Sequence, residues 1–168
     1  MPASFARVTS YAAIVIAIAA SAAFTTFGPP RISVRKVSTG DAAPGGAVLV
    51  VEASSHMETE TLRLVGRAEG LANGRRVSQP LRTTAQSAGK FNVAKQWQDG
   101  SPWVLVLTAE MGPDGSHAVA EALVSVDARG TIGAIEYPAP GWIDRSDTPK
   151  RTSAAVIDAM LTRMVAQR

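Results

Sequence analysis

A chain of 168 residues, 46% apolar and 18% charged, is long enough for one globular domain and too apolar for a disordered protein. Its net charge of +3 is spread along the chain without a basic block, which argues against nucleic-acid binding. The lack of cysteine excludes a disulfide framework, a thiolate nucleophile and a cysteine-based zinc site.

Residues 1–27 predict a segment that takes the rest of the chain out of the cytoplasm. Arg7 precedes the apolar stretch Tyr11–Ala20, and the small residues Ser21 and Ala22 follow, which are the parts of a secretory signal. Residues 8–27 are also 20 uncharged residues, just enough to cross a bilayer. We therefore expect either a cleaved signal peptide and a periplasmic or exported protein, or an anchor in the inner membrane over residues 8–27.

Turn signals divide residues 46–138 into short apolar runs. Residues 28–45 are rich in proline and glycine, and we expect a linker there with a possible edge strand around Ile32 and Val34. Seven or eight strands follow, without a helical period between them. This spacing predicts an all-β fold, an antiparallel immunoglobulin-like β-sandwich over residues 46–138.

Within this region, three features locate individual strands. Ala47–Val51 is a continuous apolar run and predicts a strand at the centre of a sheet. Asn73-Gly74 predicts a hairpin turn, and Pro80 places the strand after it at an edge or a bulge. His117–Val126 and Thr131–Tyr137 predict two further strands after the Pro113-Asp114-Gly115 turn.

Gly89–Leu107 reads as two strand-like runs joined by a Gly/Pro turn, and we expect a central hairpin there. Trp97 and Trp103 stand on either side of the connection, where they are expected to anchor the core. The alternative is an exposed tryptophan pair that stacks on a sugar or a peptide.

A C-terminal amphipathic α-helix is predicted over residues 149–168, after a Pro/Gly loop at 139–148. Pro149 suits the first helical position. One face of this helix carries apolar residues at Ile157, Met160, Leu161, Met164 and Val165. We expect this stripe to pack on the chain's own domain, pinned by Trp142 in the loop. The alternative is that it docks on an envelope protein partner.

Few residues of the sequence suggest catalysis or metal binding. G-x-S-x-G, H-E-x-x-H, P-loop and G-x-G-x-x-G motifs are absent, so we predict no catalytic residue and no organic cofactor. The sharpest candidate is a copper site made by His56 and Met57 together with Met111 and His117, because imidazole and thioether groups are copper ligands. The alternative is that the methionines fill gaps and the histidines lie at solvated loop ends.

The pattern Gly89-x-Phe91 followed by Gly100-x-x-Trp103-x-Leu105-x-Leu107 resembles a hairpin of small exported immunoglobulin-like domains of the FixH/YtkA-like kind. The resemblance implies an accessory role in the envelope, in metal handling or in the assembly of a membrane complex. It carries no functional residue over to this chain.

The sequence therefore predicts an exported, non-enzymatic binding or accessory module of the cell envelope. Contact with the membrane is expected only through the N-terminal segment, if it is not cleaved. One alternative is a periplasmic copper-binding protein that uses the His/Met ligands, and another is a small hydrolase or carbohydrate-binding domain.

Overall fold

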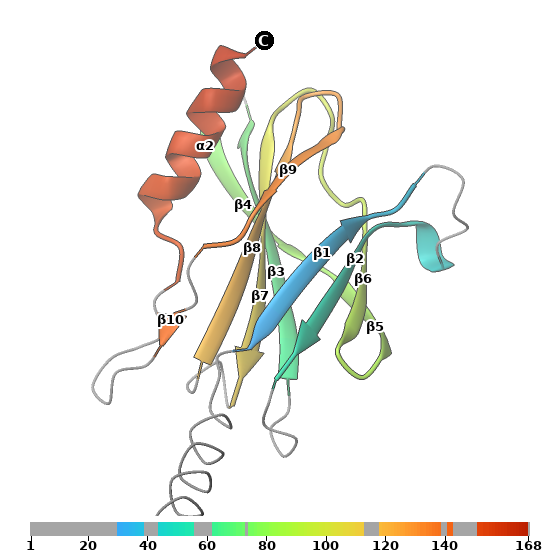
Figure 1. Cartoon of the computed structure of the whole chain (residues 1–168). Helices are drawn as coiled ribbons and strands as arrows, with labels where there is room; N and C mark the ends of the chain where they lie inside the picture. Colours follow the sequence, from blue (N-terminus) through green and yellow to red (C-terminus); the bar gives the residue numbers. More distant parts are fainter. Residues whose placement is uncertain are drawn as a thin grey trace, which may run out of the picture.

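Two antiparallel β-sheets packed face to face form the body of the protein (Figure 1). The computed structural model describes residues 30–38, 44–55, 62–72, 74–112, 118–138, 141–142 and 151–167. The predicted segment 1–27 lies outside these residues, and so does the choice between signal peptide and anchor. Among the described residues, no helix is both long and apolar enough to cross a membrane.

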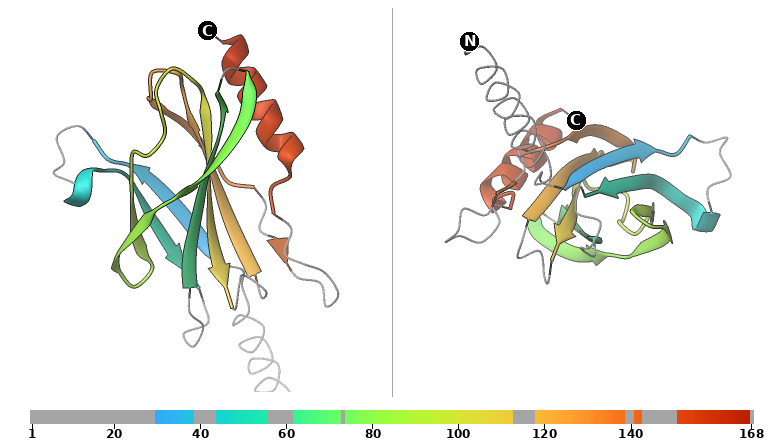
Figure 2. Two further views of the ribbon diagram at one scale, coloured as in Figure 1. Left: turned by 180° about the vertical axis from the view of Figure 1, so that it is seen from behind. Right: turned by 60° about the horizontal axis from the view of Figure 1, so that its bottom comes forward.

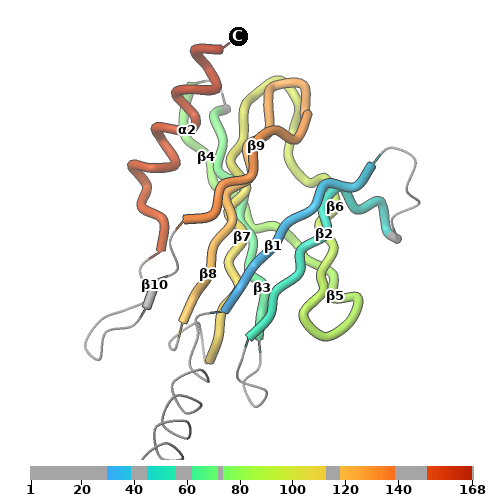
Figure 3. Tube along the Cα trace, viewed as in Figure 1, coloured from blue at the N-terminus to red at the C-terminus, as the bar shows by residue number. Residues whose placement is uncertain are grey.

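Sheet A contains four strands, in the spatial order β1 (Arg31–Lys36), β2 (Ala47–Ser54), β6 (Lys90–Ala94) and β5 (Thr83–Ser87). Sheet B runs through β4 (Arg75–Leu81), β3 (Leu62–Ala72), β7 (Trp103–Met111) and β8 (Ala118–Val126). Two shorter strands, β9 (Ile132–Glu136) and β10 (Gly141–Trp142), pair with different parts of β8. The trace in Figure 3 follows this path through both sheets.

Most of the predicted strands are confirmed. The segment around Ile32 and Val34 is the edge strand β1, and the Ala47–Val51 run lies in β2, paired on both sides. Gly74, with a φ of 72°, closes the predicted hairpin between β3 and β4. The described residues form ten strands, more than the seven or eight expected, because β5 and β10 carry no apolar alternation.

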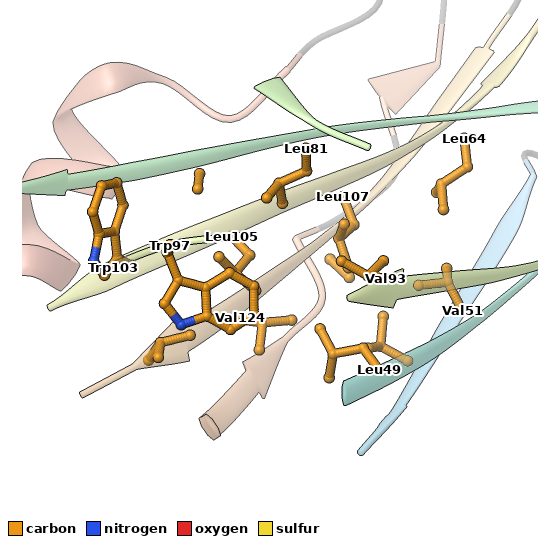
Figure 4. Close-up of a cluster of buried hydrophobic side chains, with 14 residues drawn as sticks. Leu49, Val51, Leu64, Leu81, Val93, Trp97, Trp103, Leu105, Leu107 and Val124 are labelled. Carbon is orange, nitrogen blue, oxygen red and sulfur yellow. The ribbon is translucent and has the colours of Figure 1, made fainter. Parts of the chain in front are cut away.

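The core fills the space between the two sheets (Figure 4). Inward-facing residues alternate along the strands, as in Leu49 and Val51 of sheet A opposite Leu105 and Leu107 of sheet B. All four side chains are fully buried. Trp97 and Trp103 belong to the same cluster, so the prediction that they anchor the core is confirmed.

The predicted central hairpin over Gly89–Leu107 is wrong. Its first run is β6 in sheet A and its second is β7 in sheet B, so residues 95–102 cross from one sheet to the other. The reason is that both runs have apolar faces that meet across the core, where Val93 and Leu105 lie in one cluster. Trp97 lies within this crossing and fills the space between the sheets.

A second connection between the sheets is made by strand rather than by loop. β4 belongs to sheet B and β5 to sheet A, and only Arg82 separates them (Figure 2, left). Pro80 lies just before this bend, as expected for a proline in an edge strand. Gly89, with a φ of 71°, then turns β5 back into β6.

The C-terminal helix is shorter than predicted. It is α2 (Ala154–Ala166), with Ser153 at its N-cap, so the predicted start at residue 149 is wrong. Arg151 and Thr152 are not helical, because they bind carboxylates of sheet B instead. Figure 1 shows α2 lying along sheet B, on the side away from sheet A.

The helix packs on its own domain, as expected. Ile157, Met160 and Leu161 are buried, and they cluster with residues of β7 and β8 such as Val104 and Leu123. Of the other two residues of the predicted stripe, Met164 is half-buried and Val165 is exposed. The side chain of Trp142 lies outside the described part, so its proposed contact with α2 stays a prediction.

Gly70 in β3 is directly opposite Trp103 in β7. A Cβ atom at position 70 would overlap the indole ring of Trp103, because the ring lies flat over the Gly70 backbone. The indole Nε1–H also donates to the Gln98 carbonyl at 2.8 Å, which holds the ring in this place. The close approach therefore requires glycine at position 70.

We expect Gly70→Ala to lower the free energy of unfolding by about 1–3 kcal/mol, since Trp103 must leave its rotamer or the strands must separate. Urea unfolding followed by tryptophan fluorescence measures this loss. Gly133→Ala in β9 is the control, because its Cβ would meet mainly the Ser125 hydroxyl, which can rotate. Equal stability of the two variants would contradict the steric account.

Candidate functional site

A groove lies where the bent strand β4–β5 passes beside β6. Its volume is about 730 Å³, which is within the usual range for ligand sites. The groove is lined by residues of η1 (Pro44–Gly46), β2, the β4–β5 strand, β6 and the residues after β6: Gly45, Ala47, Gln79, Pro80, Arg82, Thr84, Ala85, Gln86, Asn92, Ala94 and Gln96. A smaller hollow of about 170 Å³ lies between α2 and β9.

The side chain of Gln96 holds one end of the groove in place. Its Oε1 accepts from the backbone N–H of Arg82 at 2.8 Å, and its Nε2 donates to the Arg82 carbonyl at 2.9 Å. These two bonds occupy the backbone groups of the one residue between β4 and β5. Gln79 adds a bond from its Nε2 to the Gln96 carbonyl at 3.0 Å. The bend is therefore fixed by amide groups that also line the groove.

The described lining of the groove is polar and suited to hydrogen bonding. It offers four side-chain amides and a threonine hydroxyl, and no carboxylate, histidine or aromatic ring is found among its described residues. Asn92 and Thr84 lie opposite each other on neighbouring strands, and Asn92 is buried. Of the described lining residues, Arg82 alone is charged, and its side chain is exposed.

A second polar cluster lies on the other side of the molecule, between sheet B and the segment before α2. Glu110 is 3% exposed and binds Arg63 at 2.6 Å and Arg151 at 2.7 Å. Glu121 is also buried, and it accepts from the Thr108 hydroxyl at 3.1 Å and from the Thr152 backbone N–H at 2.6 Å. These carboxylates hold the start of the helical segment on the sheet.

A third buried carboxylate, Glu69, lies on the same face of sheet B. It binds Arg67 at 3.0 Å and Arg76 at 3.4 Å. Arg76 also reaches Asp158 of α2 at 2.5 Å, so it joins the helix to the sheet. Each of these three glutamates is bound by several donors and none lines the groove. Their contacts with Arg76, Arg151 and Thr152 join sheet B to α2 and to the segment before it.

Burial acts to raise the pKa of Glu110, but hydrogen bonds from Arg63 and Arg151 and their positive charges outweigh it. The pKa of Glu110 therefore lies below its ordinary value. A carboxyl group with a lowered pKa in the folded state stabilises the fold above its unfolded pKa. This contribution is lost as the pH falls through the folded pKa.

Of the four predicted copper ligands, the structure describes only Met111. Met111 ends β7, is buried, and its Sδ accepts from the Ser55 hydroxyl at 2.9 Å. The other three residues, His56, Met57 and His117, lie outside the described residues. Among the residues that are described, no group of three or more His, Asp or Glu side chains converges as a metal site. The copper hypothesis thus stays a prediction.

The alternative reading of the tryptophan pair does not fit their positions. Trp97 and Trp103 are 4% and 5% exposed, so neither ring offers a face on which a sugar or a peptide can stack. Sequence reasoning also missed the groove, because its polar residues come from separate strands and follow no motif. The one local signal was Pro80, which marks an edge strand or a bulge next to the bend.

Comparisons of the chain with protein-family models, with curated proteins and with solved structures found no match.

We expect Glu110→Gln to lower the free energy of unfolding by about 1–2 kcal/mol at pH 7, because an amide cannot replace the charge that both arginines bind. Solvent screens part of this interaction, because Arg63 and Arg151 are partly exposed. Denaturant unfolding from pH 7 to pH 3 measures the difference, which should shrink at low pH as wild-type Glu110 is protonated.

The matched control is Glu136→Gln, which removes an exposed carboxylate 3.9 Å from Arg163 and should change stability by less than about 0.5 kcal/mol. A loss for Glu110→Gln that is the same at pH 3 as at pH 7 would contradict the ionic account. In that case the loss would come from packing alone.

Proposed function

We propose that this protein is an exported, non-enzymatic binding or accessory module of the cell envelope, and that the groove beside β5 is its binding site. The observation that carries the proposal is the lining of the groove. Amides and a hydroxyl recognise a ligand through hydrogen bonds, and the described lining residues include no acid or base for proton transfer. The groove is also large enough for a ligand of several residues.

Export is supported by the sequence of residues 1–27, which has a charged start, an apolar centre and small residues at its end. The domain contains no cysteine and therefore needs no oxidising or reducing environment for its stability. The fold is stabilised by the apolar core between the sheets and by the ionic contacts of the segment before α2.

We further propose that the sandwich is of the immunoglobulin-like kind. The order of the strands supports this assignment. Taken as A to G along the chain, β1-β2-β6-β5 corresponds to the A-B-E-D sheet, and β8-β7-β3-β4 corresponds to the G-F-C-C′ sheet. The strands β9 and β10, together with α2, are additions after strand G. The assignment concerns the fold alone, and the proposed role rests on the groove.

Each alternative function would depend on residues other than those of the groove. A hydrolase would need a carboxylate or histidine beside a groove, whereas the buried Glu69 and Glu110 are bound by arginines of sheet B and by Arg151. A copper-binding protein would use Met111, which ends β7 and is not among the residues that line the groove, together with His56, Met57 and His117. An envelope partner that docks on the apolar stripe of α2 would first have to displace the helix from sheet B.

The test uses the full-length protein in detergent micelles and three probes: a pool of random 12-residue peptides, chitohexaose, and copper as Cu(I) and Cu(II). We expect an organic probe to shift the backbone amide resonances of Thr84, Asn92 and Gln96, without turnover of the probe. Ala94→Phe, which places a ring in the groove, should weaken this binding by about tenfold or more.

Ala134→Phe is the matched control, because it fills only the smaller hollow beside α2 and should leave binding unchanged. Fluorescence of the buried tryptophans shows whether each variant is folded. Organic probes that shift no groove resonance, together with copper binding tighter than about micromolar, would replace the proposal by the copper alternative.

A further inference from the structure

The two sheets have four edges, and three of them are protected against pairing with a strand of another chain. Along β1, the Tyr137 hydroxyl accepts from the Val34 backbone N–H at 3.0 Å and lies 3.5 Å from the Val34 carbonyl. The edge of β8 is covered by two short strands, β9 and β10, which pair with it. Along β4, Arg75 and Arg76 add charge and Pro80 lacks a donor. Each is a recognised device against unwanted strand pairing.

The fourth edge, β5, is the least protected among the described residues, since its one protective device there is the bulge between Ala85 and Ser87. Thr83–Ser87 contains no charged residue and no proline, and no described element pairs with its outer side. Figure 2 (right) shows β5 at the rim of the sandwich, with its other side against β6. An open strand edge without charge is a template for another strand, and its exposure here requires an explanation.

The groove continues from this edge. Thr84 and Gln86 of β5 line it, and Thr84 is the register partner of Asn92 on β6. A strand added to β5 would therefore extend sheet A along the groove, and its alternate side chains would enter on the side of Thr84 and Asn92. The bulge between Ala85 and Ser87 limits a regular ladder to Thr83–Ala85, so the groove must supply the remaining contacts.

The lining also indicates the chemistry of the occupant. Its described residues include no aromatic ring on which a sugar would stack, while the Gln86 amide and the Thr84 hydroxyl, both on β5, match the donors and acceptors of a peptide backbone. Arg82 is exposed at the bend, and no carboxylate in the described part of the chain pairs with its guanidinium. A complementary ligand carries one carboxylate opposite Arg82 and is otherwise uncharged.

We infer that β5 accepts an extended peptide segment of a partner protein as an additional strand of sheet A, with an acidic residue of the segment bound by Arg82. This inference rests on the proposed function, because it names the class of ligand for the same groove. Main-chain hydrogen bonds to β5 supply affinity, and the groove selects small, uncharged polar side chains.

The experiment begins with the full-length protein in detergent micelles, used to select binders from a phage-displayed library of random 12-residue peptides. The best peptide is synthesised with a fluorophore, and its dissociation constant is measured by fluorescence anisotropy. A series of single N-methylated versions then tests the role of each backbone amide. In an added strand only alternate N–H groups face β5, and the regular ladder covers only Thr83–Ala85. Methylation should therefore weaken binding about tenfold at alternate positions of the short stretch opposite these residues, and little elsewhere.

Arg82→Glu should weaken the same peptide by about tenfold, and replacing the acidic residue of the peptide by its amide should remove this effect. Arg75→Glu is the matched control, since it reverses an exposed charge on the protected edge β4 and should leave the affinity unchanged. Fluorescence of the buried tryptophans again confirms that both variants are folded.

Several outcomes would overturn the inference while leaving the proposed function in place. One is a selected peptide that tolerates methylation equally at every position, which would mean recognition by side chains alone. Another is that no peptide binds while chitohexaose occupies the groove. A third is self-association, measured by light scattering, that the peptide competes away, because the occupant would then be a second copy of the chain. If no probe of any class binds the groove, the proposed function fails as well.

Discussion

The bend at Arg82 is the constraint on which the functional part of this structure depends. A single residue separates a strand of sheet B from a strand of sheet A, so its backbone groups leave the regular ladders. Gln96 supplies the missing partners through both ends of its amide. A corner held by side-chain amides leaves a polar hollow beside it, whereas a corner filled by apolar residues would have extended the core. The groove and the free edge of β5 both follow from this corner.

The two sheets differ in what lies on their outer faces. Sheet B is covered over part of its length by α2, through the apolar contacts of Ile157 and Leu161. Beyond the helix the same face carries Glu110 and Glu121. The segment before α2 supplies a donor to each of them, from the Arg151 side chain to Glu110 and from the Thr152 backbone to Glu121. Buried carboxylates of this kind cost free energy unless they are paired, and here each one is. Within the described residues, sheet A has no such cover, and its edge at β5 adjoins the groove.

Much of the fold could be predicted from local patterns. The apolar run Ala47–Val51, the Asn73-Gly74 turn and the stripe Ile157, Met160 and Leu161 each signal their element because burial on one face imposes a period on the residues. The predicted hairpin at Gly89–Leu107 failed for a related reason. Two apolar runs joined by a short turn look alike whether they pair in one sheet or face each other across the core.

The candidate site was much less predictable than the core. Thr83–Ser87 has no alternation because both its faces are largely exposed, and Gln79, Gln96 and Arg82 come from three different positions along the chain. The start of α2 was predicted too early, because Arg151 and Thr152 have no local signal for their bonds to Glu110 and Glu121. Such bonds join residues about 30 to 40 positions apart, as the separations of 31 and 41 show.

The sequence by itself determined that the domain is built from β-strands, that Trp97 and Trp103 belong to the core, and that an amphipathic helix follows the strands. Hydrophobic periodicity and turn chemistry act between near neighbours, so these features are written into short stretches of the chain. Only the tertiary structure decided which strands share a sheet, which edge stays open, and where polar side chains meet to form the groove. Those outcomes depend on pairing across long separations, where many arrangements bury the same apolar surface and the packing of the whole chain selects one.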